Sequence, residues 1–442
     1  MGKLKDIKGI ARTSAILIAV IIIIIAAVGV YYVVYYEPAP GEPFKIAVVS
    51  DVGGRGDLSF NDMAFKGGEE AEEDFNVHMV EIISTVEADY VPNLEIGAKD
   101  ENVSLIVGVG FLLSDALADV ARRYPDKNFV GIDTTAQLVI QDDYPNEYPL
   151  PNLMDIWYEE HKGSALVGAL GAMLAAYWQH SYIGVVLGME IPVLWKFEIG
   201  YKWGCDWAIN WLATNHPELD VGIVATPKKE RVLWTYTGTF SDITKGYQAA
   251  KPMYEKGALA VYNVAGPLGL GINQAVEEIA DQYNLVYGPP FWIGVDANQD
   301  WINPGFVIAS MMKRVDLGVY YATELVREGI FRDTVTDTNG AITLGVGTEV
   351  AGDLKEGISV STLSDLDEFI AMGERAEQLT GTEVLPMEPA QIRTKVQEMR
   401  DDVPDWIWDG IEELEEDIRS GDVEVPVALT QDVVDSWRDV FG

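Results

Sequence analysis

The chain contains few residues that could support metal or redox chemistry. Among its 442 residues there is one cysteine, Cys205, and there are four histidines. A single cysteine cannot form a disulfide or a thiolate metal site within one chain, and the histidines show no metal-ligand spacing such as HExxH. We therefore expect no structural disulfide, no zinc site and no metal cofactor. Cys205 lies in an aromatic run, residues 201–211, and is predicted to be a small buried residue.

Basic residues are also scarce. The chain has 31 lysines and arginines against 70 aspartates and glutamates, which gives a formal net charge of −39. Such a chain repels nucleic acids and anionic lipid surfaces, and it disfavours phosphate-rich ligands. Because 48% of the residues are hydrophobic, a chain of this length can bury the cores of two or three domains.

The N-terminal residues have the pattern of a membrane anchor. Residues 1–14 carry Lys3, Lys5, Lys8 and Arg12, and residues 15–36 then carry no charge. That run is long enough to span a bilayer as a helix, and its positive flank is expected to stay in the cytoplasm. A cleaved signal peptide is the alternative. We favour a retained anchor, with residues 37–43 as a short stiff linker and the rest of the chain outside the cell.

From residue 44 onward, short apolar runs alternate with helical patterns. The runs expected to be strands are residues 46–49, 103–109, 129–132, 182–187, 221–225, 233–236, 260–265, 291–295 and 307–309. Repeated strand–helix units predict an α/β fold with doubly wound parallel sheets, and two such series predict two lobes with a cleft between them. Residues 159–178 are expected to form a buried core helix rather than a second membrane span.

The first of these units, residues 44–65, places polar residues directly after a buried strand. Asp51 follows the strand, two glycines follow Asp51, and Phe60 and Asn61 precede a polar helix. In open α/β sheets, ligands bind at the carboxyl ends of the strands. These residues are therefore candidates for ligand contacts, although an ordinary strand–turn–helix with a capping asparagine fits the same pattern.

Several stretches, spread in order over the chain after residue 43, form a recognisable set. They include SDVGGRGDLSFNDMAFKG (50–67), GFLLSDALADVARRYPDKNFVGIDTT (110–135), YTGTFSDITKG (236–246), AGPLGLG (265–271), GVDANQD (294–300) and SMMKRVD (310–316). Together they resemble one family, the basic membrane protein (PnrA-like) family of solute-binding lipoproteins, whose characterised members bind purine nucleosides. The resemblance implies a type I periplasmic-binding-protein fold, in which two Rossmann-like lobes are joined by three crossovers. The lobes are expected at residues 44–160 with 297–345, and at 161–296 with 346–364.

The resemblance also implies a set of ligand-binding residues. Matched position by position, they are Asp51, Phe60, Asn61, Asp115, Phe197, Gly266, Asp296 and Lys313. Two aromatic rings can stack on a purine, the carboxylates can accept hydrogen bonds from ring N–H groups and ribose hydroxyls, and the lysine can donate. Each residue could also be structural: the phenylalanines as core residues, Asp115 as a helix cap, Asp296 as a strand end, and Lys313 as a surface lysine.

Some details at this site stay open. Trp195 or Phe240 could supply the second ring in place of Phe197. The family usually has a glycine and a threonine where this chain has Pro267 and Leu268, which puts the ligand specificity in question. Residues 365–442 are expected to form an acidic, partly helical extension that packs on the lobes, with helices at 363–380 and 405–418.

The resemblance implies a non-enzymatic function. The chain is expected to capture a nucleoside by closure of its cleft and to deliver it to the permease of an ABC importer. The alternatives are an extracellular ligand-sensing receptor module, or a binding protein for another small solute such as a sugar. An enzyme such as a nucleoside hydrolase is disfavoured, because the sequence shows no nucleophile–base arrangement, no metal-ligand spacing and no phosphate-binding loop.

Overall fold

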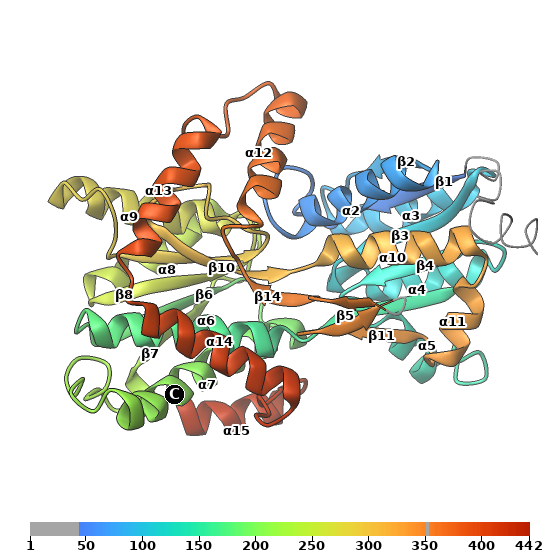
Figure 1. Cartoon of the computed structure of the whole chain (residues 1–442). Helices are drawn as coiled ribbons and strands as arrows, with labels where there is room; N and C mark the ends of the chain where they lie inside the picture. The colour runs from blue at the N-terminus through green and yellow to red at the C-terminus, as the bar shows by residue number, and fades with distance from the viewer. Residues whose placement is uncertain (1–43, 351–352) are drawn as a thin grey trace, which may run out of the picture. The chain divides into compact units, whose positions relative to one another are not determined.

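The computed structural model of the chain (Figure 1) describes residues 44–350 and 353–442. The predicted cytoplasmic segment, membrane anchor and linker, residues 1–43, lie outside the described residues. Within the part that is described, none of the helices combines the length and the apolar character needed to cross a membrane.

The first lobe is built on a six-stranded parallel sheet with the order β11-β5-β4-β3-β1-β2. Its strands are β1 (Lys45–Val49), β2 (His78–Ile82), β3 (Val103–Val109), β4 (Asn128–Ile132), β5 (Leu153–Tyr158) and β11 (Ala341–Leu344). Its helices are α2 (Phe60–Phe75), α3 (Tyr90–Lys99), α4 (Ser114–Arg123), α5 (Ala136–Asp143), α10 (Val315–Glu328) and α11 (Phe331–Asp337). Helices α2 and α10 pack together, and α4 packs between α3 and α5.

The second lobe repeats this plan with the strand order β14-β10-β9-β8-β6-β7. Its strands are β6 (Tyr182–Leu187), β7 (Val232–Tyr236), β8 (Ala258–Val264), β9 (Phe291–Asp296), β10 (Val307–Lys313) and the antiparallel β14 (Ile358–Val360). Its helices are α6 (Glu160–Tyr177), α7 (Pro192–Asn215), α8 (Ile243–Glu255) and α9 (Leu268–Tyr283). All residues of β8, β9 and β10 are buried, as expected for parallel strands that helices cover on both faces.

Short elements complete the described part of the chain. Three 3₁₀ helices lie at Glu87–Asp89, Phe111–Leu113 and Lys228–Glu230. Strands β12 (Thr348–Val350) and β13 (Asp353–Lys355) form a separate antiparallel pair.

The predicted α/β class and two-lobe architecture are observed, but the chain changes lobes at a different point from the one predicted. The sequence predicted that the chain re-enters the first lobe at residue 297. In the structure, β10 pairs with β9 in the second sheet, and the chain rejoins the first lobe only from α10 onward, which packs against α2. The crossover therefore follows Lys313. The prediction was wrong because strand–helix alternation indicates that a strand is present but does not indicate which sheet the strand joins. The other crossovers join β5 to α6 and β11 to β14.

One predicted strand is absent, and the predicted core helix is present. Residues 221–225, predicted as a strand, form turns, and Val221 is 46% exposed. The helix predicted at residues 159–178 is α6, and it is buried as predicted. Its small residues let α7 approach closely: a Cβ on Gly168 would lie 2.2 Å from the Tyr201 carbonyl oxygen. Cys205, on α7, is buried.

The C-terminal extension consists of four helices, α12 (Leu366–Thr380), α13 (Pro389–Asp401), α14 (Asp405–Ser420) and α15 (Gln431–Phe441). Helix α14 packs on α6, and α15 packs on α7 (Figure 1). Arg438 of α15 forms an ion pair of 2.8 Å with Glu198, a fully buried residue of α7. Trp195 of α7 packs against Val434 of α15. The extension therefore braces the first half of α7 from outside the lobe.

Candidate functional site

A cavity lies where the carboxyl ends of the strands of both lobes meet. The space at this site is about 670 Å³, including the part that is open to solvent, which is within the range of small-molecule sites. The first lobe contributes Asp51, Gly53, Asp57, Phe60, Asn61, Gly110, Phe111, Leu112 and Asp133. Residues 160–313 contribute Ile191, Val193, Leu194, Phe197, Phe240, Val264, Ala265, Gly266, Pro267, Val295, Asp296 and Lys313.

All of the predicted site residues except Asp115 line this cavity. The structure brings together Asp51, Phe60, Asn61, Phe197, Gly266, Asp296 and Lys313, which come from both lobes. That each of them contacts a ligand stays a prediction. Pro267, at the position where the chain departs from the family pattern, also lines the cavity.

Asp115 is the exception, and the reason is the phase of helix α4. Its neighbour Ser114 is buried, and the Ser114 hydroxyl donates to the Phe111 carbonyl and accepts from the backbone N–H of Thr135. The next residue of a helix is turned by about 100°, so Asp115 is exposed at the first turn and lies outside the cavity.

The identity of the second aromatic ring is resolved in part. Trp195 is packed against α15 in a cluster with Ile199, Ala428 and Val434, away from the cavity. Both Phe197 and Phe240 line the cavity. Trp195 is therefore removed as a candidate, and Phe240 is an additional wall residue.

A network of carboxylate and amide side chains lines the first-lobe side of the cavity. The Asn61 amide Nδ2 donates to Asp51 Oδ1 at 2.9 Å and to Asp57 Oδ2 at 3.0 Å. Asp57 also accepts the backbone N–H groups of Ser59, Asn61 and Asp62, so Asp57 caps α2 and leaves Asn61 free for the network. A Cβ at Gly53 would lie 2.7 Å from Asn61 Nδ2, which is why residue 53 is glycine. Burial raises the pKa of Asp51.

Lys313 is the centre of the charge arrangement. It is 1% exposed and forms ion pairs with Asp133 and, at 2.8 Å, with Glu160. Burial opposes its positive charge, but Asp133, Glu160 and Asp296 outweigh burial and raise its pKa. Burial likewise opposes ionisation of Glu160, but Lys196 and Lys313 lower the pKa of Glu160 to about 2. Lys313 therefore stays charged and is held by acids from more than one element.

Three aromatic rings surround the same ammonium group. Lys313 Nζ lies 5.2 Å from the ring centroid of Phe60, 5.1 Å from that of Tyr158 and 5.5 Å from that of Phe197. These distances are within the range of cation–π contacts. The rings of Phe60 and Phe197, from α2 and α7, therefore border the same small volume from different lobes.

Asp133 is a cavity residue that the sequence reasoning did not select. Asp133 directly follows strand β4, and Asp296 is the last residue of strand β9. Strands β4 and β9 occupy equivalent positions in the strand orders of the two sheets. Both aspartates adopt left-handed backbone conformations, with φ of 60° and 64°, which is uncommon outside glycine. Burial raises the pKa of Asp133 to about 6, although Lys313 opposes the rise. The available signal was the position of Asp133 directly after a predicted strand, in the matched stretch 110–135.

The two lobes are in direct contact beside the cavity. The Ser59 hydroxyl, in the first lobe, donates to Asp296 Oδ2 at 2.8 Å in the second. Gln299 Nε2 donates to the Leu58 carbonyl at 3.0 Å. The structure is therefore a closed arrangement at this edge.

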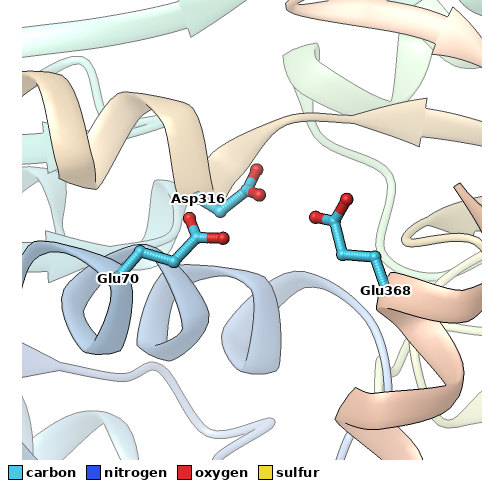
Figure 2. Close-up of side chains that lie close together, drawn as sticks. All are labelled: Glu70, Asp316 and Glu368. Atoms are coloured by element: carbon cyan, nitrogen blue, oxygen red, sulfur yellow. The ribbon is translucent and has the colours of Figure 1, made fainter. Parts of the chain in front are cut away.

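A second acidic cluster lies apart from the cavity, where α2, α10 and α12 meet. Figure 2 shows Glu70, Asp316 and Glu368 pointing toward one another. Lys66 Nζ lies 2.6–2.8 Å from a carboxylate oxygen of each. The Lys66 ammonium group thus occupies the position at which a metal cation would be expected. The cluster also links α12 to the first lobe.

Comparisons with known proteins agree with this geometry. A family model described as "ABC transporter substrate-binding protein PnrA-like" matches residues 44–208 and 215–367. An uncharacterised lipoprotein of Pyrococcus horikoshii is 34% identical over 385 residues, which are 87% of this chain and 84% of that one. The nucleoside-binding protein BmpA of an ABC transporter of Lactococcus lactis is 26% identical, covering 73% of this chain and 87% of that one.

A solved structure is also similar. The crystal structure of an ABC transporter solute-binding protein from Aeropyrum pernix K1 superposes with a TM-score of 0.72 and 32% identity, covering 89% of this chain and 96% of that one. The matched stretches span both lobes and the cavity between them. The chain therefore belongs to the basic membrane protein family of PnrA-like ABC transporter substrate-binding proteins.

Proposed function

We propose that the chain binds a nucleoside, with a purine as the preferred base, and delivers it to the permease of an ABC importer. The observation that carries the proposal is the pair of phenyl rings, Phe60 and Phe197, on either side of one cavity whose polar groups are mostly carboxylates. A purine is a flat apolar disc with polar edges, and each base–aromatic stack contributes on the order of 1–3 kcal/mol.

The charge of the cavity favours a neutral ligand over a phosphorylated one. Asp51, Asp57, Asp133 and Asp296 line it, and its one lysine already pairs with acids. A nucleotide would bring negative charge to these carboxylates, and like charges disfavour binding. Ribose hydroxyls and ring N–H groups are hydrogen-bond donors, which is what carboxylates accept. A nucleoside therefore complements the cavity better than its monophosphate.

The mechanism is closure of the two lobes around the ligand. The lobes are joined by three crossovers, and the cavity takes residues from both lobes. A ligand shifts the balance toward the closed state only to the extent that it binds that state better. Contacts with rings from both lobes can be made together only when the lobes are closed, and this provides that difference.

We further propose that residues 15–36 hold the protein at the outer face of the cell membrane. Related chains from Pyrococcus are named lipoproteins. This chain has only Cys205, which is buried in α7, so its anchor is proposed to be the apolar segment itself. Carbonate extraction of membranes, followed by immunodetection, tests this. Release into the soluble fraction would contradict it.

The ligand is tested by calorimetric titration of the full chain in detergent. The protein is first unfolded and refolded to remove any carried-over ligand. Saturable binding of inosine, guanosine or adenosine, with much weaker binding of the monophosphates, supports the proposal. If a sugar binds and nucleosides do not, the binding-protein function stays and the ligand is wrong. Turnover of a nucleoside would contradict the proposed non-enzymatic role.

A sensing role is the second candidate. A receptor module would bind the same ligand but would pass a signal to a partner rather than supply a permease. Uptake of radiolabelled nucleoside by cells with and without the gene separates the two. Unchanged uptake in the deletion strain would favour sensing.

A further inference from the structure

A short turn of the first lobe, residues 57–59, packs against the second lobe beside the cavity. Its backbone is held within the first lobe: the N–H of Leu58 donates to Asp62 Oδ2 at 2.9 Å, and the N–H of Ser59 donates to Asp57 Oδ1 at 3.0 Å. Leu58 and Ser59 are both buried, but neither lines the cavity. The contacts that these two residues make with the second lobe are therefore separate from the cavity wall.

Leu58 has an unusual backbone conformation. Its φ is 52°, in the left-handed region that leucine rarely adopts. Such conformations persist only where the surrounding contacts require them. Here the turn presents the Leu58 carbonyl to the second lobe, where Gln299 Nε2 donates to it at 3.0 Å. Gln299 is itself held, because its Oε1 accepts the backbone N–H of Val295 at 3.0 Å. The uncommon conformation thus occurs at a contact between the lobes.

The Ser59 hydroxyl makes the second contact of this turn with the other lobe. It lies 2.8 Å from Asp296 Oδ2 and 3.1 Å from the Val295 carbonyl oxygen. Asp296 lines the cavity. Among residues 44–350 and 353–442, no other group donates a hydrogen bond to the Asp296 carboxylate. The orientation of a cavity carboxylate in the second lobe therefore depends on a donor in the first lobe.

Helix capping does not account for Ser59. A serine directly before a helix ordinarily accepts a backbone N–H of the first turn. The Ser59 side chain makes no such bond to α2. Asp57 instead accepts the N–H groups of Asn61 and Asp62. Because Asp57 already caps the helix, the Ser59 hydroxyl is available for its contact with the second lobe.

We propose that Ser59 is a positioning residue, which orients the Asp296 carboxylate toward the ligand only when the two lobes are closed. The inference rests on the proposed function, since it gives Asp296 a contact with the bound nucleoside. Ser59 itself does not touch the ligand. When the lobes open, Asp296 loses its donor and its carboxylate is free to turn. Closure therefore completes the site as well as enclosing the ligand, and this adds to the preference of the ligand for the closed state.

The experiment is a calorimetric titration of the full chain and its Ser59→Ala variant with inosine, after unfolding and refolding to remove any carried-over ligand. We expect Ser59→Ala to weaken binding by about 10- to 150-fold, the factor for one hydrogen bond to a charged group. The matched control is Ser164→Ala. Ser164 is a fully buried serine of α6 whose hydroxyl lies 3.3 Å from that of Tyr262, in the same lobe. This control should bind inosine as the unchanged chain does.

The ratio of the two affinities should also depend on pH. Burial raises the pKa of Asp296, and Lys313 and the Ser59 hydrogen bond oppose the rise. Without the hydroxyl this pKa rises further, so more of the Asp296 carboxyl is protonated at low pH and accepts hydrogen bonds less well. The loss in Ser59→Ala should therefore be larger at pH 5 than at pH 8. The other cavity carboxylates, such as Asp133, titrate in both proteins and cancel from the ratio.

The outcomes separate this inference from the function on which it rests. No binding of inosine or another nucleoside by the unchanged chain would contradict the proposed function, and this inference with it. Binding by the unchanged chain and equal binding by Ser59→Ala would overturn the inference alone. A loss in Ser59→Ala that is the same at pH 5 and pH 8 would show that the hydroxyl does not act through Asp296, and would also overturn it.

Discussion

Lys313→Met is the substitution whose effect the structure specifies most fully. It removes a buried ammonium group that pairs with Asp133 and Glu160 and lies beside three aromatic rings. Removal of one partner of a buried ion pair costs about 3–5 kcal/mol, and contacts of methionine sulfur with aromatic rings return about 0.3–1.5 kcal/mol. We therefore expect the free energy of unfolding to fall by about 1.5–4.7 kcal/mol.

The loss should depend on pH in a defined direction. In the folded protein, burial already raises the pKa of Asp133 from 3.8 to about 6, even with Lys313 beside it. Without Lys313 the pKa of Asp133 rises further. A carboxyl whose folded pKa exceeds its unfolded pKa makes the protein less stable as the pH rises through that range. The deficit of Lys313→Met should therefore be smaller at pH 5 than at pH 8.

Urea unfolding followed by circular dichroism measures the effect at both pH values. Lys251→Met is the matched control, because Lys251 makes a surface ion pair of 2.7 Å with Glu278, and surface pairs contribute about 0–1 kcal/mol. Asp133→Asn added to Lys313→Met should restore part of the stability, because it removes the stranded charge. If Lys313→Met costs no more than Lys251→Met, or if its deficit shrinks as the pH rises, the reasoning is refuted.

Three other substitutions test the site and its support. Phe60→Ala and Phe197→Ala should each weaken nucleoside binding by roughly 5- to 150-fold in calorimetry, the equivalent of one base stack; unchanged affinity in both would remove the stacking model. Asp133→Asn should weaken binding by about tenfold or more, as expected for a lost charged hydrogen bond, whereas exposed Asp115→Ala should leave it unchanged. Arg438→Met should lower the free energy of unfolding by about 1.5–3 kcal/mol in urea titration, because it removes two charged hydrogen bonds to the buried Glu198 carboxylate, which keeps only Lys202 and Tyr236 as partners; a change near zero would show that α15 does not brace α7.

Much of the fold can be predicted from the sequence, because parallel strands that are buried on both faces have short, continuous apolar sequences. Strands β3 and β6 occupy the predicted residues, and the predicted helix at 405–418 is α14. The edge strand β2 was missed because only Met79 and Ile82 of its five residues are buried, so the sequence HMVEI is not a continuous apolar run. The error at residues 221–225 has the opposite cause: a short apolar run there lies in turns around Gly222, whose φ is 62°.

The site is less predictable because its groups meet only in three dimensions. Asp51, Phe60 and Asn61 lie in one unit, and local pattern placed them correctly beside one cavity. Lys313 was also placed there, but its pairing with Glu160, at the opposite crossover, depends on how the two lobes join. Asp115 was selected through the family resemblance; it is exposed and lies outside the cavity, because the phase of α4 turns Ser114 inward instead.

The symmetry of the two lobes explains why Asp133 belongs to the site. Asp133 and Asp296 follow from equivalent strands and share a left-handed backbone, with φ of 60° and 64°. Strain of this kind costs on the order of 1–3 kcal/mol and persists where the surrounding structure requires it. Here the Asp133 carboxylate pairs with Lys313, and the Asp296 carboxylate accepts the Ser59 hydroxyl and helps to raise the pKa of Lys313. Since asparagine also tolerates this conformation, Asp133→Asn changes the charge and leaves the backbone intact, so a loss of affinity in that variant reports on the carboxylate itself.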